Sequence, residues 1–148
     1  MRSLFLLLFL LAVAPVCPVS AQIFSTIEEC DALYGTASTN ADPTNDVRFY
    51  KQDGLTIKVL FVEKKAAVVT FTPSTSLKMD KATQQKVLDA NAGGNGWEEI
   101  EGEGAKTWQR GDGLAFAIYD NSNGELNIFS TDYIEKSKDE VATAINQQ

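Results

Sequence analysis

The sequence predicts an α+β fold in which an antiparallel sheet packs against two or three helices. Short runs rich in β-branched and aromatic residues follow one another at close intervals, bounded by turn-forming residues. Within these runs apolar residues alternate with others, which is typical of strands with one buried face. Two segments with apolar residues at helical spacing precede two groups of such runs, and a third helical segment closes the chain.

Residues 1–21 have the features of a secretory signal peptide. Arg2 gives a positive start, an apolar run extends from Leu4 to Val16, and Val19-Ser20-Ala21 matches the site that signal peptidase reads. Cleavage there leaves residues 22–148 as a single domain. The apolar run is shorter than the about 20 residues of a membrane-spanning helix, although an uncleaved anchor is the alternative. We therefore expect a periplasmic or extracellular protein with no transmembrane segment after cleavage.

The chain has two cysteines, Cys17 and Cys30, and we expect Cys30 alone to be present in the mature protein. Cys17 lies within the signal peptide, and Val16 before it is not the small residue that a lipoprotein signal requires. Cys30 is then alone in the mature chain, which excludes an intramolecular disulfide. It falls on the apolar face of a predicted helix, where we expect it to be buried and unreactive. The chain has no histidine, which excludes Cys–His catalysis.

The charge is acidic, with 20 acidic and 13 basic side chains and a net charge of −7. Nucleic acid binding requires clustered Lys and Arg that displace counterions, so we expect no nucleic acid partner. The same balance opposes electrostatic docking on anionic lipid. An acidic surface is consistent with a soluble exported protein.

The first predicted unit is a short helix followed by three strands. Ser25 and Glu28 have the spacing of a capping box, and Gly35 supplies a stop after a helix of about ten residues. A polar loop follows over residues 36–46. The strands are predicted over Val47–Lys51, Leu55–Val62 and Ala66–Thr72, with Asp53-Gly54 as a hairpin turn between the first two.

Leu60 breaks the strict alternation of apolar and other residues in the second strand. Alternation places Ile57, Val59 and Phe61 on one face, and Lys58 and Leu60 on the other. An apolar residue on the Lys58 side has two interpretations. Either the strand is covered on both faces, or Leu60 belongs to a docking surface.

The second predicted unit is a longer helix followed by four strands. The helix spans Asp80–Asn91 and ends at Gly93-Gly94. The strands are predicted over Trp97–Ile100, Lys106–Arg110, Leu114–Tyr119 and Glu125–Ser130. A last helix is predicted over 132–146, where the capping-box spacing of Ser137 and Glu140 leaves open a break near Ser137.

The two units favour a tandem helix-plus-meander organisation, with half-repeats 25–72 and 79–131. Aligning Asp53-Gly54-Leu55 on Asp112-Gly113-Leu114 places Ile57 over Phe116. The same alignment places Val59 over Ile118, Val69 over Ile128, and Tyr50 one residue out of step with Trp108. The alternative is that any helix-plus-meander domain gives this pattern by chance.

Three residues are candidates for partner binding: Trp97, Trp108 and Leu60. The two tryptophans stand beside Gly-rich sequence rather than inside apolar runs, and aromatic residues are enriched where proteins dock. The alternative for the tryptophans is a place in the core. The leading functional interpretation is an exported, non-enzymatic binding module with a protein partner.

The alternative function is a small hydrolase that uses carboxylates near Trp97. The densest acidic run is Glu98, Glu99, Glu101 and Glu103, and a carboxylate pair performs general acid–base chemistry on glycosides. The turn at Asp120 does not have calcium-loop spacing, because its glycine stands fifth rather than sixth. We expect no cofactor and no metal, and we name no catalytic residue.

Two segments carry a resemblance to known exported proteins. Residues 26–35, TIEECDALYG, followed by the YKQDGL turn at 50–55, resemble small envelope lipoproteins of the outer-membrane assembly machinery. The doubled arrangement resembles the β-lactamase inhibitor proteins, and the chain also looks like short exported proteins of unassigned function in environmental bacteria. The resemblance implies an inhibitor-like or envelope-associated role. The membrane anchoring of the lipoproteins is not expected here, because the chain lacks a lipoprotein signal. No functional residue of these families is assigned to the chain either, because it has no matching site motif.

The signal-peptide interpretation predicts the mature N-terminus. Mass spectrometry of the exported protein is expected to show a chain that begins at Gln22, free or cyclised to pyroglutamate. A mature protein that retains Met1 or Arg2 would contradict the interpretation.

Overall fold

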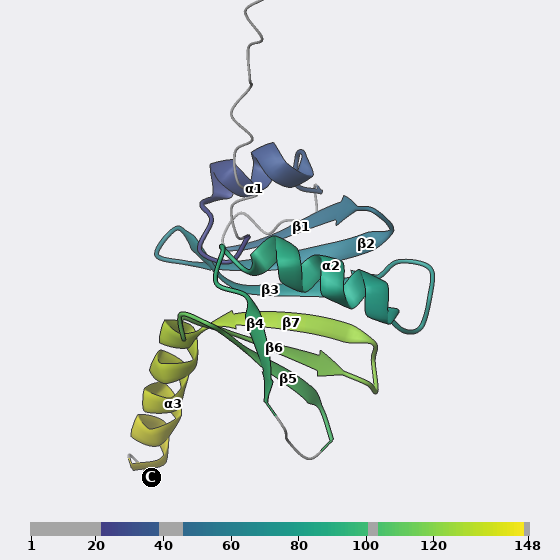
Figure 1. Cartoon of the computed structure of the whole chain (residues 1–148). Helices are drawn as coiled ribbons and strands as arrows, with labels where there is room; N and C mark the ends of the chain where they lie inside the picture. The colour runs from purple at the N-terminus through teal and green to yellow at the C-terminus, as the bar shows by residue number, and fades with distance from the viewer. Residues whose placement is uncertain (1–21, 39–45, 101–103, 147–148) are drawn as a thin grey trace, which may run out of the picture.

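The computed structural model describes residues 22–38, 46–100 and 104–146 (Figure 1), so the predicted signal peptide lies outside the described residues. The described chain has the predicted α+β fold, with one seven-stranded antiparallel sheet and three helices. The helices are α1 (Ile27–Tyr34), α2 (Lys81–Asn91) and α3 (Thr131–Asn146). The strands are β1 (Val47–Gln52), β2 (Leu55–Val62), β3 (Lys65–Pro73), β4 (Trp97–Ile100), β5 (Lys106–Arg110), β6 (Ala115–Asp120) and β7 (Glu125–Ser130).

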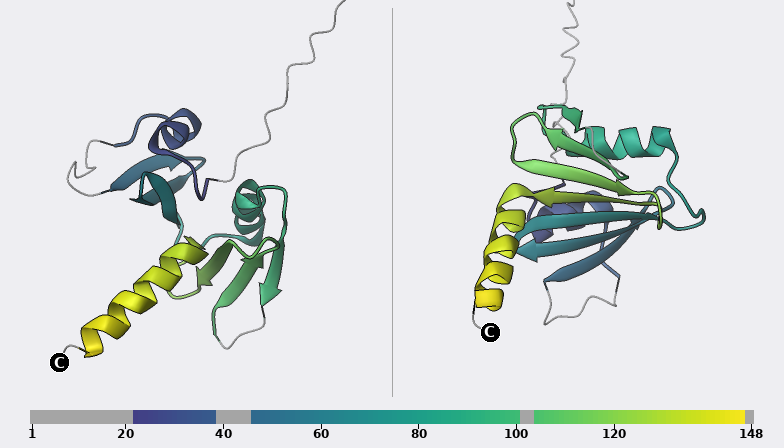
Figure 2. Two further views of the ribbon diagram at one scale, coloured as in Figure 1. Left: turned by 90° about the vertical axis from the view of Figure 1, so that its left-hand side faces the viewer. Right: turned by 90° about the horizontal axis from the view of Figure 1, so that it is seen from below.

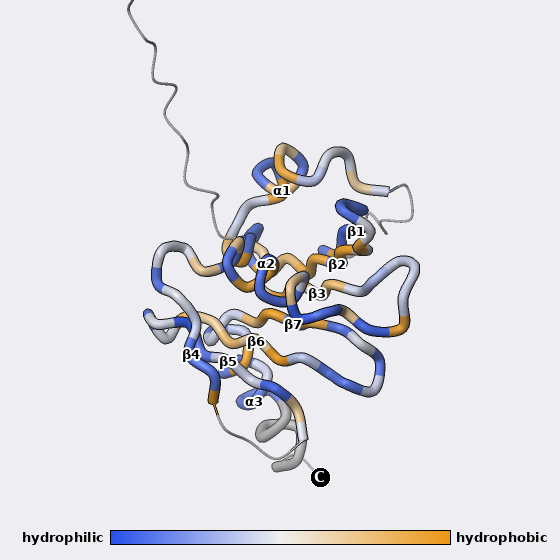
Figure 3. Tube along the Cα trace, turned by 45° about the vertical axis from the view of Figure 1, so that its right-hand side comes forward, coloured by the Kyte–Doolittle hydropathy of each residue, from blue (hydrophilic) through white to orange (hydrophobic). Residues whose placement is uncertain are grey.

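The sheet consists of two meanders joined side by side. Its strand order is β1-β2-β3-β7-β6-β5-β4, so the only pairing between the meanders among the described strands is that of β3 with β7. Helices α1 and α2 lie on one side of the sheet, whereas α3 continues from β7 and leaves on the other side (Figure 2). Hydrophobic residues concentrate along the central strands (Figure 3).

The side of the sheet beneath α1 and α2, here called the helix-covered face, carries the core. Ile57, Val59 and Phe61 point there and are at most 2% exposed, as the alternation predicts. Lys58 is exposed on the other side, here called the open face, and Leu60 is half-buried there. The strand therefore keeps its alternation throughout, and Leu60 marks an apolar position on the open face.

Helix α1 begins one residue later than the sequence predicts. The capping box is formed by Thr26 and Glu29: the Thr26 hydroxyl accepts from the Glu29 amide at 3.2 Å, and the Glu29 carboxylate accepts from the Thr26 amide at 2.8 Å. Ser25 does not take this position because its carbonyl accepts a hydrogen bond from the Ala66 amide at 2.8 Å. Ser25 is thereby held beside β3, and Thr26 caps the helix instead.

Helix α3 is continuous through Ser137, so the break that the sequence left open does not occur. The Ser137 hydroxyl donates to the Tyr133 carbonyl at 2.8 Å, one turn back along the helix. This back-bonding satisfies the side chain within the helix and removes the need for a cap. The helix begins where the Ser130 hydroxyl accepts from the Tyr133 amide at 3.2 Å.

The start of the domain is attached to the end of α2 by a buried asparagine. Asn91 is 0% exposed, and its side-chain oxygen accepts from the Ile23 amide at 3.1 Å. Its amide nitrogen donates to the Val87 carbonyl at 2.9 Å. Because every polar atom of a buried amide needs a partner, these bonds fix residue 23 against the second unit.

The register of the two hairpins corrects the residue matching that the sequence predicted. Tyr50 pairs with Ile57 in the first unit, and Trp108 pairs with Ala117 in the second. Ile57 therefore corresponds to Ala117, and Phe116 lies on the open face. The cause is that the second turn has one extra residue on each side of Asp112-Gly113, with Leu114 in the turn and 53% exposed. Whether the units are a true repeat stays a prediction.

Burial of Cys30 gives a prediction on reactivity. The side chain is 0% exposed, and burial, with Asp31 and Glu29 nearby, raises the pKa of its thiol to about 11. Because the thiolate is the reactive form, thiol labelling of the native protein is expected to be slow and to become fast in denaturant. Fast labelling of the native state, or a disulfide-linked dimer, would contradict this placement.

Candidate functional site

The two candidate tryptophans lie on the helix-covered face. Trp108 is 9% exposed and belongs to the core. Trp97 is half-buried, and its indole nitrogen donates to the Leu88 carbonyl of α2 at 2.6 Å. Leu60 lies on the opposite side of the sheet, so the structure does not bring the three residues together. Both tryptophans contribute packing, and a role for any of the three in partner binding stays a prediction.

The carboxylates near Trp97 do not form a pair in the described chain. Glu98 and Glu99 are both exposed on β4, and neighbouring side chains of a strand point to opposite faces. Glu101 and Glu103 lie outside the described residues. None of the three hollows described below is lined by Glu98 or Glu99.

An apolar row crosses the open face from strand to strand. Cross-strand pairing places five residues side by side on β1, β2, β3, β7 and β6, in the order Val47, Leu60, Val68, Phe129 and Phe116. All five are half-buried, and the helices α1 and α2 lie on the other side of the sheet. The apolar row defined by these residues is therefore left in contact with solvent in the isolated chain.

The next transverse row along the strands has a polar centre. It holds Lys58, Thr70 and Asn127, where the Thr70 hydroxyl donates to the Asn127 side-chain oxygen at 2.8 Å. One step further, the Thr72 hydroxyl donates to the Glu125 carboxylate at 3.0 Å. The apolar row is thus bordered at its centre by polar groups that are hydrogen-bonded within the sheet, whereas Phe49 and Ile118 are the apolar ends of the neighbouring row.

The first turn of α3 forms a wall at the apolar row. Tyr133 stands beside Leu60, Val68 and Phe129, and together with Val47, Lys58 and Thr70 they enclose a hollow of about 230 Å³. The hollow lies in the corner between the open face and α3, so the sheet and the helix offer one concave surface.

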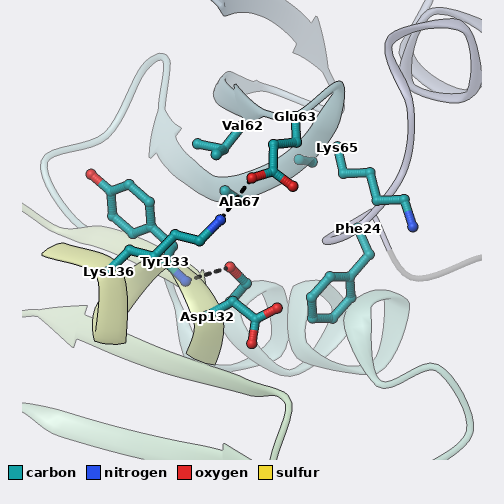
Figure 4. Close-up of a pocket in the computed structure, with 10 residues that line it drawn as sticks. Phe24, Val62, Glu63, Lys65, Ala67, Asp132, Tyr133 and Lys136 are labelled. Carbon is teal, nitrogen blue, oxygen red and sulfur yellow. Dashed lines mark hydrogen bonds and ion pairs between the residues drawn. The ribbon is translucent and has the colours of Figure 1, made fainter.

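A second hollow of about 250 Å³ lies between the first turns of α3 and the turn that joins β2 to β3 (Figure 4). Lys136 donates to the Glu63 carboxylate at 2.8 Å, and Phe24 closes the opposite wall. The hydrogen bond and charge of Lys136 hold the pKa of Glu63 below its ordinary value. The contribution of this ion pair to the stability of the fold is therefore present at neutral pH. It is lost as the pH falls through the lowered pKa of Glu63.

A third hollow lies on the helix-covered face, between α1 and α2. This groove has a volume of about 300 Å³. Its apolar lining includes Leu33 and Tyr34 from α1, Leu55, Ile57 and Phe71 from the sheet, and Val87 and Ala90 from α2. Its polar lining includes Asp53 and Lys86, which form an ion pair of 2.9 Å.

Two tyrosines in contact beside the groove, with their rings tilted by 37°, differ in their hydrogen bonding. The rings of Tyr34 and Tyr50 have centroids 5.3 Å apart. The Tyr50 hydroxyl donates to the Asp31 carboxylate at 2.8 Å. The Tyr34 hydroxyl is buried and has no hydrogen-bond partner among the described residues. Burial raises the pKa of Tyr34, so the hydroxyl stays protonated and remains a donor.

Of the five residues of the apolar row, Leu60 alone was predicted from the sequence as a candidate for partner binding. The available signal was two adjacent apolar residues within a strand, as at Val68-Val69 and Ile128-Phe129. One member of each pair enters the core, so the other lies on the open face. No sequence pattern shows that the outward members share a row, because that depends on the register between distant strands.

The described part of the chain has neither a cluster of metal ligands nor a helix that could cross a membrane. The described residues include no group of three or more Cys, Asp or Glu side chains arranged to hold a metal ion. Within the same part of the chain, no helix combines the length and apolar character needed to cross a membrane.

Comparison with known proteins shows similarity at the level of structure alone. No protein-family model and no curated protein matches the chain. A cysteine-rich secretory protein of Staphylococcus aureus has a similar structure, with 12% sequence identity and a TM-score of 0.43. The match covers 76% of this chain and 44% of that one, so this chain spans less than half the length of that protein. The resemblance to envelope lipoproteins and β-lactamase inhibitor proteins stays a prediction.

The tyrosine pair gives a matched stability test. Tyr34→Phe removes a buried hydroxyl without a partner, so the free energy of unfolding is expected to stay unchanged or to rise. Tyr50→Phe removes the hydrogen bond to Asp31 and is expected to lower it by about 0.5–1.5 kcal/mol. Denaturant melts of both variants measure the difference. A larger loss for Tyr34→Phe than for Tyr50→Phe would show that the Tyr34 hydroxyl is paired.

Proposed function

We propose that this protein is an exported, non-enzymatic binding module that docks a protein partner on its open face. The observation that carries the proposal is the apolar row of Val47, Leu60, Val68, Phe129 and Phe116. Apolar surface left outside the core of a small protein is typical of interaction sites. With strands about 4.8 Å apart, the row is about 19 Å long, which suits a segment of a partner protein.

The composition of this surface fits a protein partner better than other classes. Two phenylalanines and Tyr133 supply aromatic side chains, which are enriched at protein interfaces. Thr70 and Asn127 place a hydrogen-bonded polar pair beside the apolar row, and protein interfaces combine apolar contacts with such polar groups. The net charge of −7 opposes nucleic acid and anionic lipid as partners.

The corner between the open face and α3 supports the choice of this surface over the rest of the molecule. A partner segment placed along the apolar row meets the sheet below it and Tyr133 beside it, so it is contacted on two sides. Contact on two sides raises the apolar area buried per residue of the partner. The predicted signal peptide at residues 1–21 supports a periplasmic or extracellular location. In that location, the apolar surface is consistent with an inhibitor-like or envelope-associated role.

Site-specific photocrosslinking tests this proposal. Leu60 is replaced by a benzophenone amino acid in the organism that makes the chain, and Gln85, exposed on α2, is replaced likewise as the control. We expect a discrete protein adduct from position 60 and none from position 85. Adding Phe129→Glu, at the same row, is expected to abolish the adduct at position 60.

Two results would contradict the proposal. One is the absence of any protein adduct at position 60 in a folded, exported chain. The other is an adduct at position 60 that persists with Phe129→Glu in place, because such an adduct would not depend on the apolar row.

A further inference from the structure

We propose that the protein partner at the open face is a second copy of this chain, packed face to face across a twofold axis that runs along the pairing of β3 with β7. The inference rests on the proposed function, because it names the partner of the same apolar row. In the strand order of the sheet, this axis brings β3 opposite β7 and β2 opposite β6 of the second copy. Every contact in such a dimer occurs twice, once in each direction.

The charges of the open face are divided between the two units. Lys51 on β1 and Lys58 on β2 are exposed on the side of the first unit. Asp120 on β6 and Glu125 on β7 form a cross-strand pair on the side of the second unit, and Glu98 on β4 lies on the same side. One half of the open face is thus basic and the other half is acidic.

The twofold axis places the basic half of one copy against the acidic half of the other. Because β2 faces β6, Lys58 comes opposite the segment from Ile118 to Asp120 of the second copy. Neither Lys58 nor Asp120 forms an ion pair with another described residue. Hydrogen bonds from Ser122 hold the pKa of Asp120 below its ordinary value, so this carboxylate is charged at neutral pH. Complementary charge favours one partner and one orientation, and a second copy supplies the matching division of charge.

The apolar row is complementary to itself under the same rotation. On the first unit its residues are the aliphatic Val47, Leu60 and Val68, and on the second unit they are Phe129 and Phe116. The rotation places Phe129 against Val68 of the second copy and Phe116 against Leu60. Each aromatic ring thus meets an aliphatic side chain, and the half-buried residues of both rows leave contact with water, which favours association.

The hollow beside Tyr133 has the size for one of these rings. Its volume is about 230 Å³, and Leu60 and Val68 belong to its lining. A cavity of about 150 Å³ holds one benzene molecule, so a phenyl ring fits the hollow. Because Phe116 of the second copy comes opposite Leu60, its ring is placed to enter the hollow. The twofold axis repeats this contact, so each copy gives one ring and receives one.

An exchange of charge tests the inference, with sedimentation velocity of the full mature chain as the measurement. The wild type is expected to form dimers. Lys58→Glu brings carboxylates together at both contacts, and Asp120→Lys brings ammonium groups together, so each variant alone is expected to weaken dimerisation by about tenfold or more. An equimolar mixture of the two variants is expected to recover dimers, because opposite charges then meet at both contacts.

Lys81→Glu is the matched control, because it makes the same change of charge at an exposed position of α2. It is expected to leave dimerisation as in the wild type. Circular dichroism confirms the fold of each variant. If Asp120→Lys does not fold, Glu125→Lys on the neighbouring strand takes its place.

Two results would overturn the inference. One is a wild type that remains monomeric at about 0.1 mM, where even weak association is detected. The other is a mixture of the two charge variants that associates no better than either variant alone. The adduct at position 60 separates this inference from the proposed function: with a monomeric wild type, an adduct to a different protein overturns the dimer and supports the proposed function. The absence of any adduct contradicts the proposed function itself.

Discussion

The antiparallel pairing of β3 with β7 is the contact on which the rest of the structure depends. It joins the two meanders through four residue pairs and makes a single sheet of them. Val69 and Ile128 meet on the helix-covered face, while Val68 and Phe129 meet on the open face. The hydrogen bond of 2.8 Å between Thr70 and Asn127 lies at the same seam. Without this pairing neither the common core nor the apolar row would be continuous.

The apolar row on the open face and the groove between α1 and α2 both follow from the way the two units are joined. Each unit brings one helix to the same side of the sheet, and a groove lies between α1 and α2. On the opposite side, the described chain places the first turn of α3, where Tyr133 reaches the apolar row. The helices thus cover the core on one face of the sheet. The open face keeps half-buried apolar residues that the fold leaves in contact with solvent.

The sequence predicted the elements well and the surfaces poorly, for a physical reason. The seven strands and three helices of the described chain follow from local signals, as at the Asp53-Gly54 turn and at Gly93-Gly94 after α2. Trp97 was harder, because Gly-rich flanks indicate exposure whereas its indole is held by the Leu88 carbonyl of α2. The apolar row and the unpaired Tyr34 hydroxyl depend on strand register and on helix placement, which no local pattern encodes.

The central claim is that the apolar row serves a partner rather than the fold, and the stability of Leu60→Lys tests it most directly. The Leu60 side chain is half-buried on the open face, so a lysine there can keep its stem on the sheet and its charge in water. Equilibrium denaturant melts are expected to show a loss of about 1 kcal/mol or less, near the range of surface substitutions. A loss of about 2–5 kcal/mol, as for truncation of a core residue, would mean that the row is part of the core and would contradict the account.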